Sequence, residues 1–582
     1  MIVGIDLGTT NSSIAYMTDQ GPKLIPNSLG KTLTPSAVGI DSDGTVLTGA
    51  AAKDYMVVHP GKGTTAFKRF MGTERKIPLD KEEFSPEQLS ALILRSLKQD
   101  AEHYFGNANF QSVVTVPAYF NDAQRQATLN AAQIAELDVV RLINEPTAAS
   151  IAYGFHESEE SKNLLVLDLG GGTFDVSAVE MFEGVVDVRA SFGDSFLGGE
   201  DFTHVIAAEI LKSKEMKFED AEFKYPLMVA RLKYECEIAK IAISTQNNAK
   251  VRIPRLDGSF DDEQTADNTF TVWREQFEMW SAELLDRMRN PINRVMADAA
   301  WNTAQVDEII LVGGSTRMPM VHNMVEDQFH IAPRCRLNPD EVVAMGASIQ
   351  GGLFEDNRAL KDLAVTDIAP FTLGVEVSKE FGQSVKPGYM LPIIHRNRKI
   401  PSSQVKRVVT VYPDQDEIAV KVYQGEGRRV EQCTFLGEFN VTNLPKGEAG
   451  QEIDIRFSYD LNGVLEVEAT VVATEQRTQH VITSHARGLT KSEIAESIQR
   501  LHQLKPTPRD KAQWTALLKQ AERHYEQSTL NEREVMEPLM DFFEIAINSG
   551  DKEQINSAAK HLKSFMENGF DMFDDEDDNG FS

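Results

Sequence analysis

Cysteine is scarce in this chain, and its three copies stand far apart. Cys236, Cys335 and Cys433 lie roughly a hundred residues from one another, a spacing that matches neither a zinc motif nor a disulfide framework. We therefore expect three small buried thiols in a reducing compartment. Long apolar runs are lacking too, since no stretch approaches the roughly 18 residues of a membrane span. Because a strand-like run, Ile2–Leu7, follows Met1 directly, we expect no export signal and a cytoplasmic location.

Positive charge is also in deficit. Lys and Arg number 59 against 88 Asp and Glu, which gives a net charge of -29. Such a charge repels phosphate backbones and anionic lipid headgroups, so we expect no nucleic acid and no membrane among the partners. With 582 residues, 41% of them hydrophobic and 25% charged, the chain has the composition of folded domains. Its length predicts about three or four of them.

Periodicity divides the chain into regions of different texture. Over residues 1–357 strands alternate with helices, as where Ser112–Val116 precedes the helix-prone run Asn121–Ala135. From 368 to 487 the two-residue alternation of strands dominates, and Asn462-Gly463 is typical of a hairpin turn. The first region is therefore predicted to be α/β and the second an antiparallel β-domain.

The remaining segments are predicted from their composition and caps. Thr490 and Glu493 form a capping box at the start of the helical region 488–570. Residues 571–582 are acidic and too poor in apolar groups to pack, which predicts a disordered tail. Residues 358–367 hold leucines and a valine in place of glycine and proline. This segment is therefore either the tail of a helix or a connection that docks on a neighbouring domain.

An internal repeat of one strand–turn pattern is the most informative feature of the α/β region. A strand with an aspartate near its end, followed by a glycine-bearing turn and threonine, occurs at Asp6 and again at Asp168. Glycines let backbone N–H groups approach phosphates closely, and carboxylates suit Mg²⁺ held through water. A third strand, Glu308–Val312, runs into Gly313-Gly314, where a nucleoside or phosphate can rest at a helix start. Together these turns predict a nucleotide site.

Five strings in the chain resemble, in order, the signatures of the DnaK-like seventy-kilodalton heat-shock chaperones. They are Gly4–Ser12, Val116–Phe120, Asn144–Ala149, Asp168–Asp175 and Val312–Pro319. The resemblance extends over essentially the whole chain. It implies an ATP-dependent chaperone that hydrolyses ATP to ADP and phosphate and thereby binds and releases extended hydrophobic segments of unfolded proteins. The implied multidomain fold is an actin-like, two-lobed (ribonuclease-H-like) α/β ATPase domain at 1–357, a linker at 358–367, a β-sandwich peptide-binding domain at 368–487, an α-helical lid at 488–570 and an acidic tail at 571–582.

The same resemblance implies roles for residues of the ATPase domain. Those expected to bind ATP or ADP are Gly8, Thr9, Thr10, Asn11, Gly170, Gly171, Gly172, Thr173, Gly198, Gly199, Glu200, Glu237, Lys240, Ser244, Gly313, Gly314, Ser315, Arg317 and Asp340, with Asp201 completing the wall of the cleft. Asp6 and Asp168 would hold Mg²⁺ through its waters, near positions for K⁺. Hydrolysis would use Lys68, Glu145, Thr173 and Asp175. Without the resemblance, Lys68 would be read as a surface lysine.

Coupling and peptide binding are implied in the same way. Pro117, Arg125, Arg141, Asn144 and Asp367 match the allosteric relay and the contact with a J-domain co-chaperone. A nucleotide exchange factor is a further expected partner. The peptide groove would be lined by Leu373, Val375, Val408, Val411, Ile418 and Val420, with the deepest pocket at Ile418 and an arch that includes Ser378 and Val411.

Two departures from the family pattern narrow the resemblance. The linker run Leu363–Asp367 is a diluted version of an aliphatic and acidic segment, which predicts weaker coupling, and the helical region is short. The chain is most similar to the specialised bacterial HscC-type branch, which implies a bacterial cytosol.

Three alternatives remain. They are a small-molecule kinase of the same superfamily, an actin-like filament protein, and an ATP-binding holdase or exchange-factor relative with little turnover. The β and helical regions disfavour the first two, and Lys68 with Glu145, Thr173 and Asp175 disfavours the third.

Overall fold

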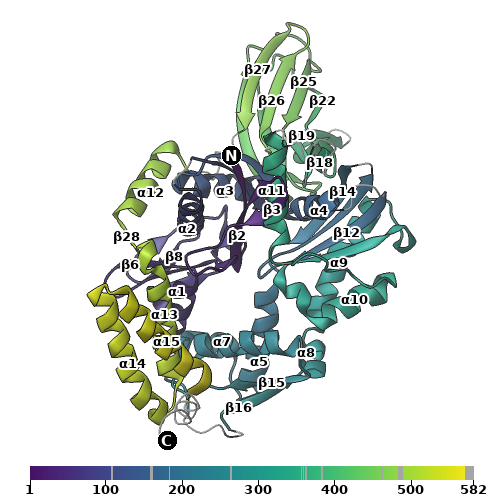
Figure 1. Cartoon of the computed structure of the whole chain (residues 1–582). Coiled ribbons are helices and arrows are strands. Elements are labelled where there is room, and N and C mark those ends of the chain that lie inside the picture. The colour runs from purple at the N-terminus through teal and green to yellow at the C-terminus, as the bar shows by residue number, and fades with distance from the viewer. Residues whose placement is uncertain are drawn as a thin grey trace, which may run out of the picture.

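The computed structural model describes most of the chain, and structural statements below concern that part. The described residues are 1–106, 109–156, 161–182, 184–261, 265, 267–355, 357, 360, 364–381, 384–460, 463–482 and 489–569. Figure 1 shows two α/β lobes, a protruding β-structure above them and a group of helices along one side. The expected tail, 571–582, falls outside the described residues.

The first lobe, which we define as residues 1–144, is built on a mixed sheet in the order β11-β10-β1-β2-β3. The strands are β1 (Ile2–Asp6), β2 (Asn11–Thr18), β3 (Gly21–Leu24), β10 (Gln111–Val116) and β11 (Val139–Asn144). Helices α2 (Pro86–Tyr104) and α3 (Asp122–Ile134) contribute to its core. Asn121 caps α3 by accepting from the Gln124 backbone N–H, so the predicted helix Asn121–Ala135 is confirmed.

A smaller sheet with α1 (Ala50–Val58) forms the outer part of this lobe. Its strands are β5 (Ala37–Ile40), β6 (Thr45–Thr48) and β7 (Gly63–Thr65), with β28 (Lys505–Pro506) added at the edge.

The second lobe, residues 161–329, repeats the hairpin plan of the first. Its sheet runs β17-β12-β13-β14, formed by β17 (Glu308–Val312), β12 (Lys162–Leu169), β13 (Phe174–Phe182) and β14 (Val185–Asp194). In both lobes a strand and its antiparallel partner bracket the glycine turn, with Asp6 opposite Ser13 and Asp168 opposite Asp175. The outer part contains α5 (Gly199–Ser213), α6 (Phe218–Lys224), α7 (Pro226–Ile243), β15 (Asn248–Arg252), β16 (Thr269–Trp273), α8 (Arg274–Trp280) and α9 (Ala282–Asp298), and α10 (Pro319–Phe329) closes the lobe. Glu308–Val312 is confirmed as a strand, although a 3-10 turn, Gly314–Arg317, precedes α10.

Two helices lie between the sheets of the two lobes. They are α4 (Glu145–His156), which begins directly after β11, and α11 (Val342–Phe354). Both contribute to one hydrophobic cluster with residues of β12 and β17. The lobes are therefore joined through α4 and α11, which lie between them in Figure 1.

The β-region folds into two four-stranded sheets with a common core. One sheet has the order β20-β19-β23-β24 and the other β22-β25-β26-β27. The strands are β19 (Leu373–Phe381), β20 (Ser384–Ile394), β22 (Ser402–Val409), β23 (Glu417–Gln424), β24 (Thr434–Thr442), β25 (Glu452–Tyr459), β26 (Leu465–Val471) and β27 (Gln476–Ile482). Val420 and Val422 of one sheet share a buried cluster with Ile455 and Phe457 of the other.

The predicted hairpin around Gly463 forms, with Tyr459 opposite Leu465. Its loop is wider than a two-residue turn, because the Asp460 N–H still donates to the Val464 carbonyl. Asn462 lies outside the described residues.

The linker is docked. Its described end forms β18 (Ala364–Ile368), which pairs in parallel with β14 and antiparallel with β21 (Lys399–Ile400). The sequence left two alternatives open, the tail of a helix or a segment docked on a neighbouring domain, and β18 is docked. The linker docks although its aliphatic and acidic run is diluted. The strand ends one residue beyond the expected linker boundary. Leu363 and its neighbours at 358, 359, 361 and 362 lie outside the described residues.

The C-terminal helices pack on the first lobe and stand apart from the protruding sheet (Figure 1). They are α12 (Lys491–Gln503), α13 (Arg509–Gln527), α14 (Leu530–Ser549) and α15 (Lys552–Asn568). Thr490 and Glu493 form the predicted capping box. Ile494 and Leu501 join the core of the first lobe, Ala516 packs in the cluster around Tyr55, and β28 pairs in parallel with β6.

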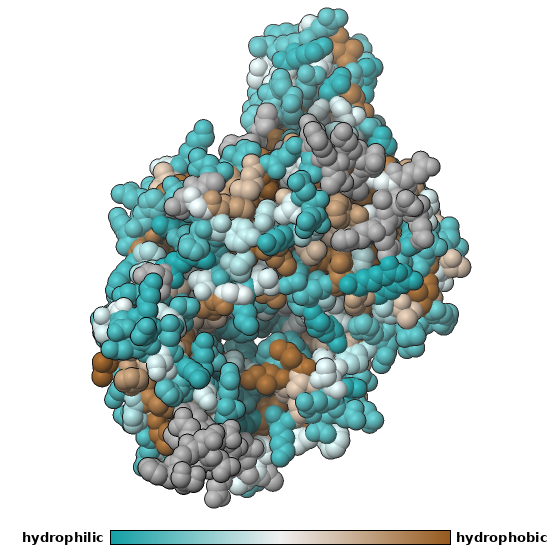
Figure 2. All heavy atoms as spheres, viewed as in Figure 1, coloured by the Kyte–Doolittle hydropathy of each residue, from teal (hydrophilic) through white to brown (hydrophobic). Residues whose placement is uncertain are grey.

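Figure 2 shows a face of the molecule covered mostly by hydrophilic residues.

Cys236 is buried, but Cys335 is exposed and Cys433 half-buried, so the expectation of three buried thiols is wrong for two of them. Only Cys236 lies on a core-facing helix, whereas the other two follow α10 and a short 3-10 turn. Among the described residues, no helix combines the length and apolarity that crossing a bilayer requires.

Candidate functional site: the cleft between the lobes

Two carboxylates from opposite lobes face the cleft, the half-buried Asp6 and the buried Asp168. Asp6 ends β1, and its Oδ1 accepts a 2.9 Å hydrogen bond from Thr115 Oγ1 on β10. Burial and then the Glu145 charge raise the pKa of Asp6 to about 7. The same two causes raise the pKa of Asp168 well above its ordinary value. Negative charge that is only partly compensated in this way suits a hard cation.

Lys68 and Glu145 form an ion pair deep in the same cleft. The Lys68 Nζ lies 2.7 Å from Glu145 Oε1, and the residues are 3% and 7% exposed. Lys68 sits on a 3-10 turn, Phe67–Phe70, and Glu145 opens α4. The reading of Lys68 as a surface lysine, which its sequence context alone favours, is therefore wrong. Breaking such a pair would leave an uncompensated buried charge.

Asp175, on β13, joins this group from the second lobe. Its Oδ1 accepts a 3.1 Å hydrogen bond from the backbone N–H of Tyr119, which follows β10 in the first lobe. Burial and then the Glu145 charge raise the pKa of Asp175 to about 7. Gly193, its partner on β14, leaves room for the carboxylate, since a Cβ there would lie 2.4 Å from Asp175 Oδ1.

The two glycine turns touch each other across the cleft. A Cβ on Gly171 would lie 1.6 Å from the Thr10 Oγ1 of the opposite turn. Thr9 and Thr173 are both buried. The first turn is held from behind by hydroxyls, because Ser12 Oγ accepts from the Gly8 N–H and Ser36 Oγ donates to the Gly8 carbonyl.

The expected nucleoside contacts gather where α5, α7 and Gly314 approach one another. Lys240 Nζ lies 2.6 Å from Glu237 Oε2 and donates to the Gly199 carbonyl at 2.9 Å. Arg317 Nη2 lies 2.9 Å from Asp340 Oδ2. The remaining members are adjacent, since Ser244 Oγ donates to the Lys240 carbonyl and a Cβ on Gly199 or Gly314 would touch Ser315 Oγ or Asp340 Oδ1. A pocket beside this group is lined by Lys240, Ile243, Ser244, Arg274, Phe277, Glu278, Met318, Pro319 and Met320.

Two hydrogen bonds join Arg125, Asn144 and the linker residue Asp367. Arg125 Nη2 donates to Asn144 Oδ1 at 2.5 Å, and Asn144 Nδ2 donates to Asp367 Oδ1 at 2.9 Å. Arg125 also holds the turn after Pro117, through the carbonyl of Phe120 at 3.1 Å.

Asn144 immediately precedes Glu145 in the chain. The linker residue Asp367 is therefore hydrogen-bonded to the direct neighbour of the glutamate that pairs with Lys68. Arg141 lies buried near Asp367, whose pKa is raised by burial.

The residues expected to line the peptide groove divide into three groups. Leu373, Val375 and Val420 are fully buried in the sandwich core. Val408 and Ile418 lie at its edge, partly exposed and packed against that core. Val411 is exposed on the segment between β22 and β23, and Ser378 on β19 is exposed as well.

Sequence reasoning missed several residues that shape the cleft. They are Thr115, Tyr119, Ser12, Ser36, Arg274, Phe277 and Met318. Thr115 directly precedes the recognised string Val116–Phe120 and Tyr119 lies within it, and that position was the available signal. The described residues contain no cluster of three or more His, Cys, Asp or Glu side chains arranged for a metal, so Asp6 and Asp168 stand as a pair.

Comparison with known proteins decides the family. The family model described as Hsp70 protein matches residues 2–78 and 73–576. The chain belongs to the Hsp70 family. Among curated relatives of this Hsp70 chain, the chaperone protein DnaK of Thermotoga petrophila and that of Thermotoga maritima are each 40% identical over 505 residues, covering 86% of this chain and 83% of theirs. The chaperone protein DnaK of Thermosipho melanesiensis is 39% identical over 505 residues, covering 86% of this chain and 82% of its own.

Proposed function

We propose that this Hsp70-family ATPase is a chaperone that couples ATP hydrolysis in the cleft to the binding and release of extended hydrophobic segments by the β-sandwich. The observation that carries the proposal is the juxtaposition of Lys68, Glu145 and the linker. Asn144 hydrogen-bonds the linker residue Asp367, and the next residue, Glu145, forms the buried ion pair with Lys68. A change at the phosphates can therefore reach the linker through adjacent residues.

The cleft residues suit an Mg-bound triphosphate held between the lobes. Asp6 and Asp168 present partly uncompensated carboxylates from opposite sides, and Gly8, Gly171 and Gly172 lie in places with no room for a side chain. Mg²⁺, when bound, neutralises charge that develops on the transferring phosphoryl group. Lys68 adds a fixed positive charge, Thr173 borders the terminal phosphate, and Glu145 and Asp175 accept hydrogen bonds from an in-line water. The polar surroundings of Asp6 and Asp168 also make K⁺ a fitting companion ion.

The nucleoside would lie against Glu237, Lys240 and Ser244 on α7, facing Arg317 and Asp340. The adjacent pocket adds Phe277 and Met318 as apolar walls and Arg274 as a cation. An adenine ring fits such a site, because apolar walls bury it while a few polar groups fix its orientation.

Partners follow from the family resemblance and from the arrangement of domains. Unfolded or extended hydrophobic segments would bind at the sandwich edge formed by Val408 and Ile418, with backbone hydrogen bonds supplied by a strand edge. A J-domain co-chaperone would dock near Arg141, Asn144 and Asp367, and a nucleotide exchange factor is a further partner. The actin-like fold of the lobes, the HscC-type branch and a bacterial cytosolic location belong to the same proposal.

Turnover of radiolabelled ATP, with and without an apolar heptapeptide, tests this function. The proposal expects slow basal release of phosphate that the peptide accelerates. Stable nucleotide binding without turnover would support a holdase, and phosphate transfer to a sugar would support a kinase. Either result would overturn the chaperone cycle.

A further inference from the structure

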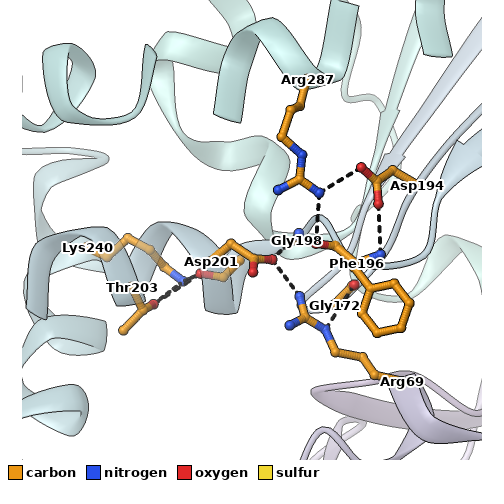
Figure 3. A network of polar contacts seen from close by, with 10 residues as sticks. Arg69, Gly172, Asp194, Phe196, Gly198, Asp201, Thr203, Lys240 and Arg287 are labelled. Carbon is orange, nitrogen blue, oxygen red and sulfur yellow. Dashed lines mark hydrogen bonds and ion pairs between the residues drawn. The ribbon is translucent and has the colours of Figure 1, made fainter. Parts of the chain in front are cut away.

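Arg69 is a first-lobe side chain whose two acceptors lie in the second lobe. Its Nε donates to the Gly172 carbonyl at 3.0 Å, and its Nη2 donates to Asp201 Oδ2 at 2.6 Å. The side chain is 14% exposed. Figure 3 shows it rising from the first-lobe ribbon toward these two groups. Arg69 therefore ties the glycine turn of the second lobe to the first lobe.

The Gly172 contact completes a row of three anchored carbonyls. The Gly170 carbonyl accepts from the Gly199 N–H and the Gly171 carbonyl from the Glu200 N–H, both at 2.9 Å. In a trans peptide the C=O and N–H of one unit point in opposite directions. Anchoring the three carbonyls therefore turns the N–H groups of the following residues away from α5 and Arg69. The first two anchors belong to the second lobe itself, and only the third comes from the opposite lobe.

Asp201 makes the same contact rigid from the other end. Its Oδ2 accepts from the Gly198 N–H at 2.8 Å as well as from Arg69, so one carboxylate oxygen joins the start of α5 to the first lobe. A Cβ on Gly198 would lie 2.4 Å from the Gly172 nitrogen, and a Cβ on Gly172 would lie 2.6 Å from Arg69 Nε. Only glycine therefore fits at these two positions beside the contact. Charge-assisted hydrogen bonds of this kind are both short and directional.

Arg69 and its neighbour Lys68 share one 3-10 turn but point to different partners. Lys68 pairs with Glu145, whereas Arg69 reaches across the cleft. We propose that Arg69 is a positioning residue: by gripping Gly172 and Asp201 it makes the phosphate-facing conformation of the second turn depend on closure of the lobes. The proposal rests on the nucleotide site proposed above. It assigns Arg69 no contact with the nucleotide.

The test compares Arg69→Ala with a matched control. Arg287 also donates to a carboxylate and a carbonyl, Asp194 and Phe196, but α9 and both acceptors belong to the second lobe (Figure 3). For Arg69→Ala we expect single-turnover hydrolysis of radiolabelled ATP to slow on the order of 10–100-fold, as misplaced catalytic geometry does. Binding of N-methylanthraniloyl-ATP with Mg²⁺ should change by less than about threefold. Arg287→Ala should leave hydrolysis within about twofold.

Two further variants separate positioning from simple loss of structure. Arg69→Lys keeps the positive charge but loses the planar guanidinium that donates to two acceptors at once. Its hydrolysis rate should therefore lie between those of Arg69→Ala and the wild-type protein. Adding Asp201→Asn to Arg69→Ala should slow hydrolysis by less than about twofold more, because both changes break one contact. Wild-type hydrolysis by Arg69→Ala, equal losses in Arg69→Ala and Arg287→Ala, or fully additive effects would each overturn the proposal. Failure of the wild-type protein to bind or hydrolyse ATP would instead overturn the proposed function.

Discussion

Buried charge gathers in two regions of this molecule, the cleft and the surfaces where the linker and the C-terminal helices dock. In the cleft, Asp6, Asp168 and Asp175 outnumber the cations near them, and burial raises the pKa of each. Where the C-terminal helices dock, acids meet bases: Lys519 lies 2.9 Å from Asp41, and Arg523 Nε lies 2.9 Å from Asp54 Oδ1. The cleft thus carries an excess of acidic groups, whereas each of these acids at the docking surface has a basic partner.

The difference shows how the two regions can work together. In largely buried ion pairs the cost of removing both charges from water offsets much of their attraction, and separation returns both charges to water. A docked surface held by such pairs can therefore separate reversibly. A cleft with uncompensated carboxylates gains much more from ligand binding. We therefore expect nucleotide binding in the cleft to be the stronger interaction. Docking of the linker and the C-terminal helices should change in response to it.

The largest predicted effect concerns the cleft. Lys68→Ala should retain ATP binding but lose single-turnover hydrolysis by at least about 100-fold, because a fixed positive charge at the transferring group is removed. Lys212→Ala, which breaks the exposed pair with Glu209 at 2.9 Å, serves as the control and should hydrolyse normally. Thermal unfolding of both variants checks that the buried Glu145 has not unfolded the domain. Undiminished turnover would remove Lys68 from the mechanism.

The second-largest predicted effect concerns the hydrogen bond that joins the cleft to the linker, between Asn144 and Asp367. Asp367→Ala removes the acceptor for Asn144, and the loss of a buried hydrogen bond to a charged group costs about 1.5–3 kcal/mol of docking free energy. We expect basal ATP hydrolysis to persist while its stimulation by an apolar heptapeptide falls about tenfold or more. Ala364→Ser, at an exposed position of the same strand, should keep the stimulation. Full stimulation in Asp367→Ala would exclude this contact as the coupling element.

How much of this arrangement the sequence could predict depends on the distance between partners. The hairpins around Asp6 and Asp168, the helix cap at Asn121 and the capping box at Thr490 are local, so their residue types alone indicate them. The sandwich core followed from the alternation of Ile453, Ile455 and Phe457, which are all buried.

Contacts between segments far apart in the chain leave no local pattern in the sequence that would predict them. Arg509 pairs with Asp100 across 409 positions, and Asn144 meets Asp367 across 223. Neither periodicity nor turn chemistry specifies a partner so far away. The packing of the helices on the first lobe and the reach of Arg69 to Asp201 were unpredictable for the same reason. Resemblance supplied the role of Lys68, but only the fold shows why that lysine is buried.

A smaller effect is expected at the sandwich edge. Ile418 lies partly exposed against the core, and Ile418→Phe should block the edge and weaken heptapeptide binding about tenfold, which corresponds to about 1.4 kcal/mol. Ala419→Phe adds the same ring on the exposed opposite face of β23 and should bind normally. Fluorescence anisotropy of a labelled peptide measures both. Unchanged affinity in Ile418→Phe would place the groove elsewhere.

The smallest effect is a pH dependence of docking between the first lobe and the sandwich. Asp122 is buried against β23, where its backbone N–H donates to Gln424, and burial raises its pKa from 3.8 to about 7 despite nearby Arg125. The ionised form is thus disfavoured in the docked state. Docking should weaken as pH rises from about 4 to about 7 and stay level above that.

Energy transfer between dyes on the first lobe and the sandwich measures this dependence. Asp122→Asn should flatten it, and Asp138→Asn, at an exposed aspartate of the same lobe, should preserve it. An unaltered slope in Asp122→Asn would assign the titration to another group.

Release of a fluorescent apolar peptide after mixing with Mg-ATP or Mg-ADP tests the central claim most directly. If cleft chemistry controls the sandwich through Asn144 and Asp367, the two nucleotides should give release rates that differ on the order of tenfold or more. Equal rates with both nucleotides, in a protein that binds them, would contradict the account.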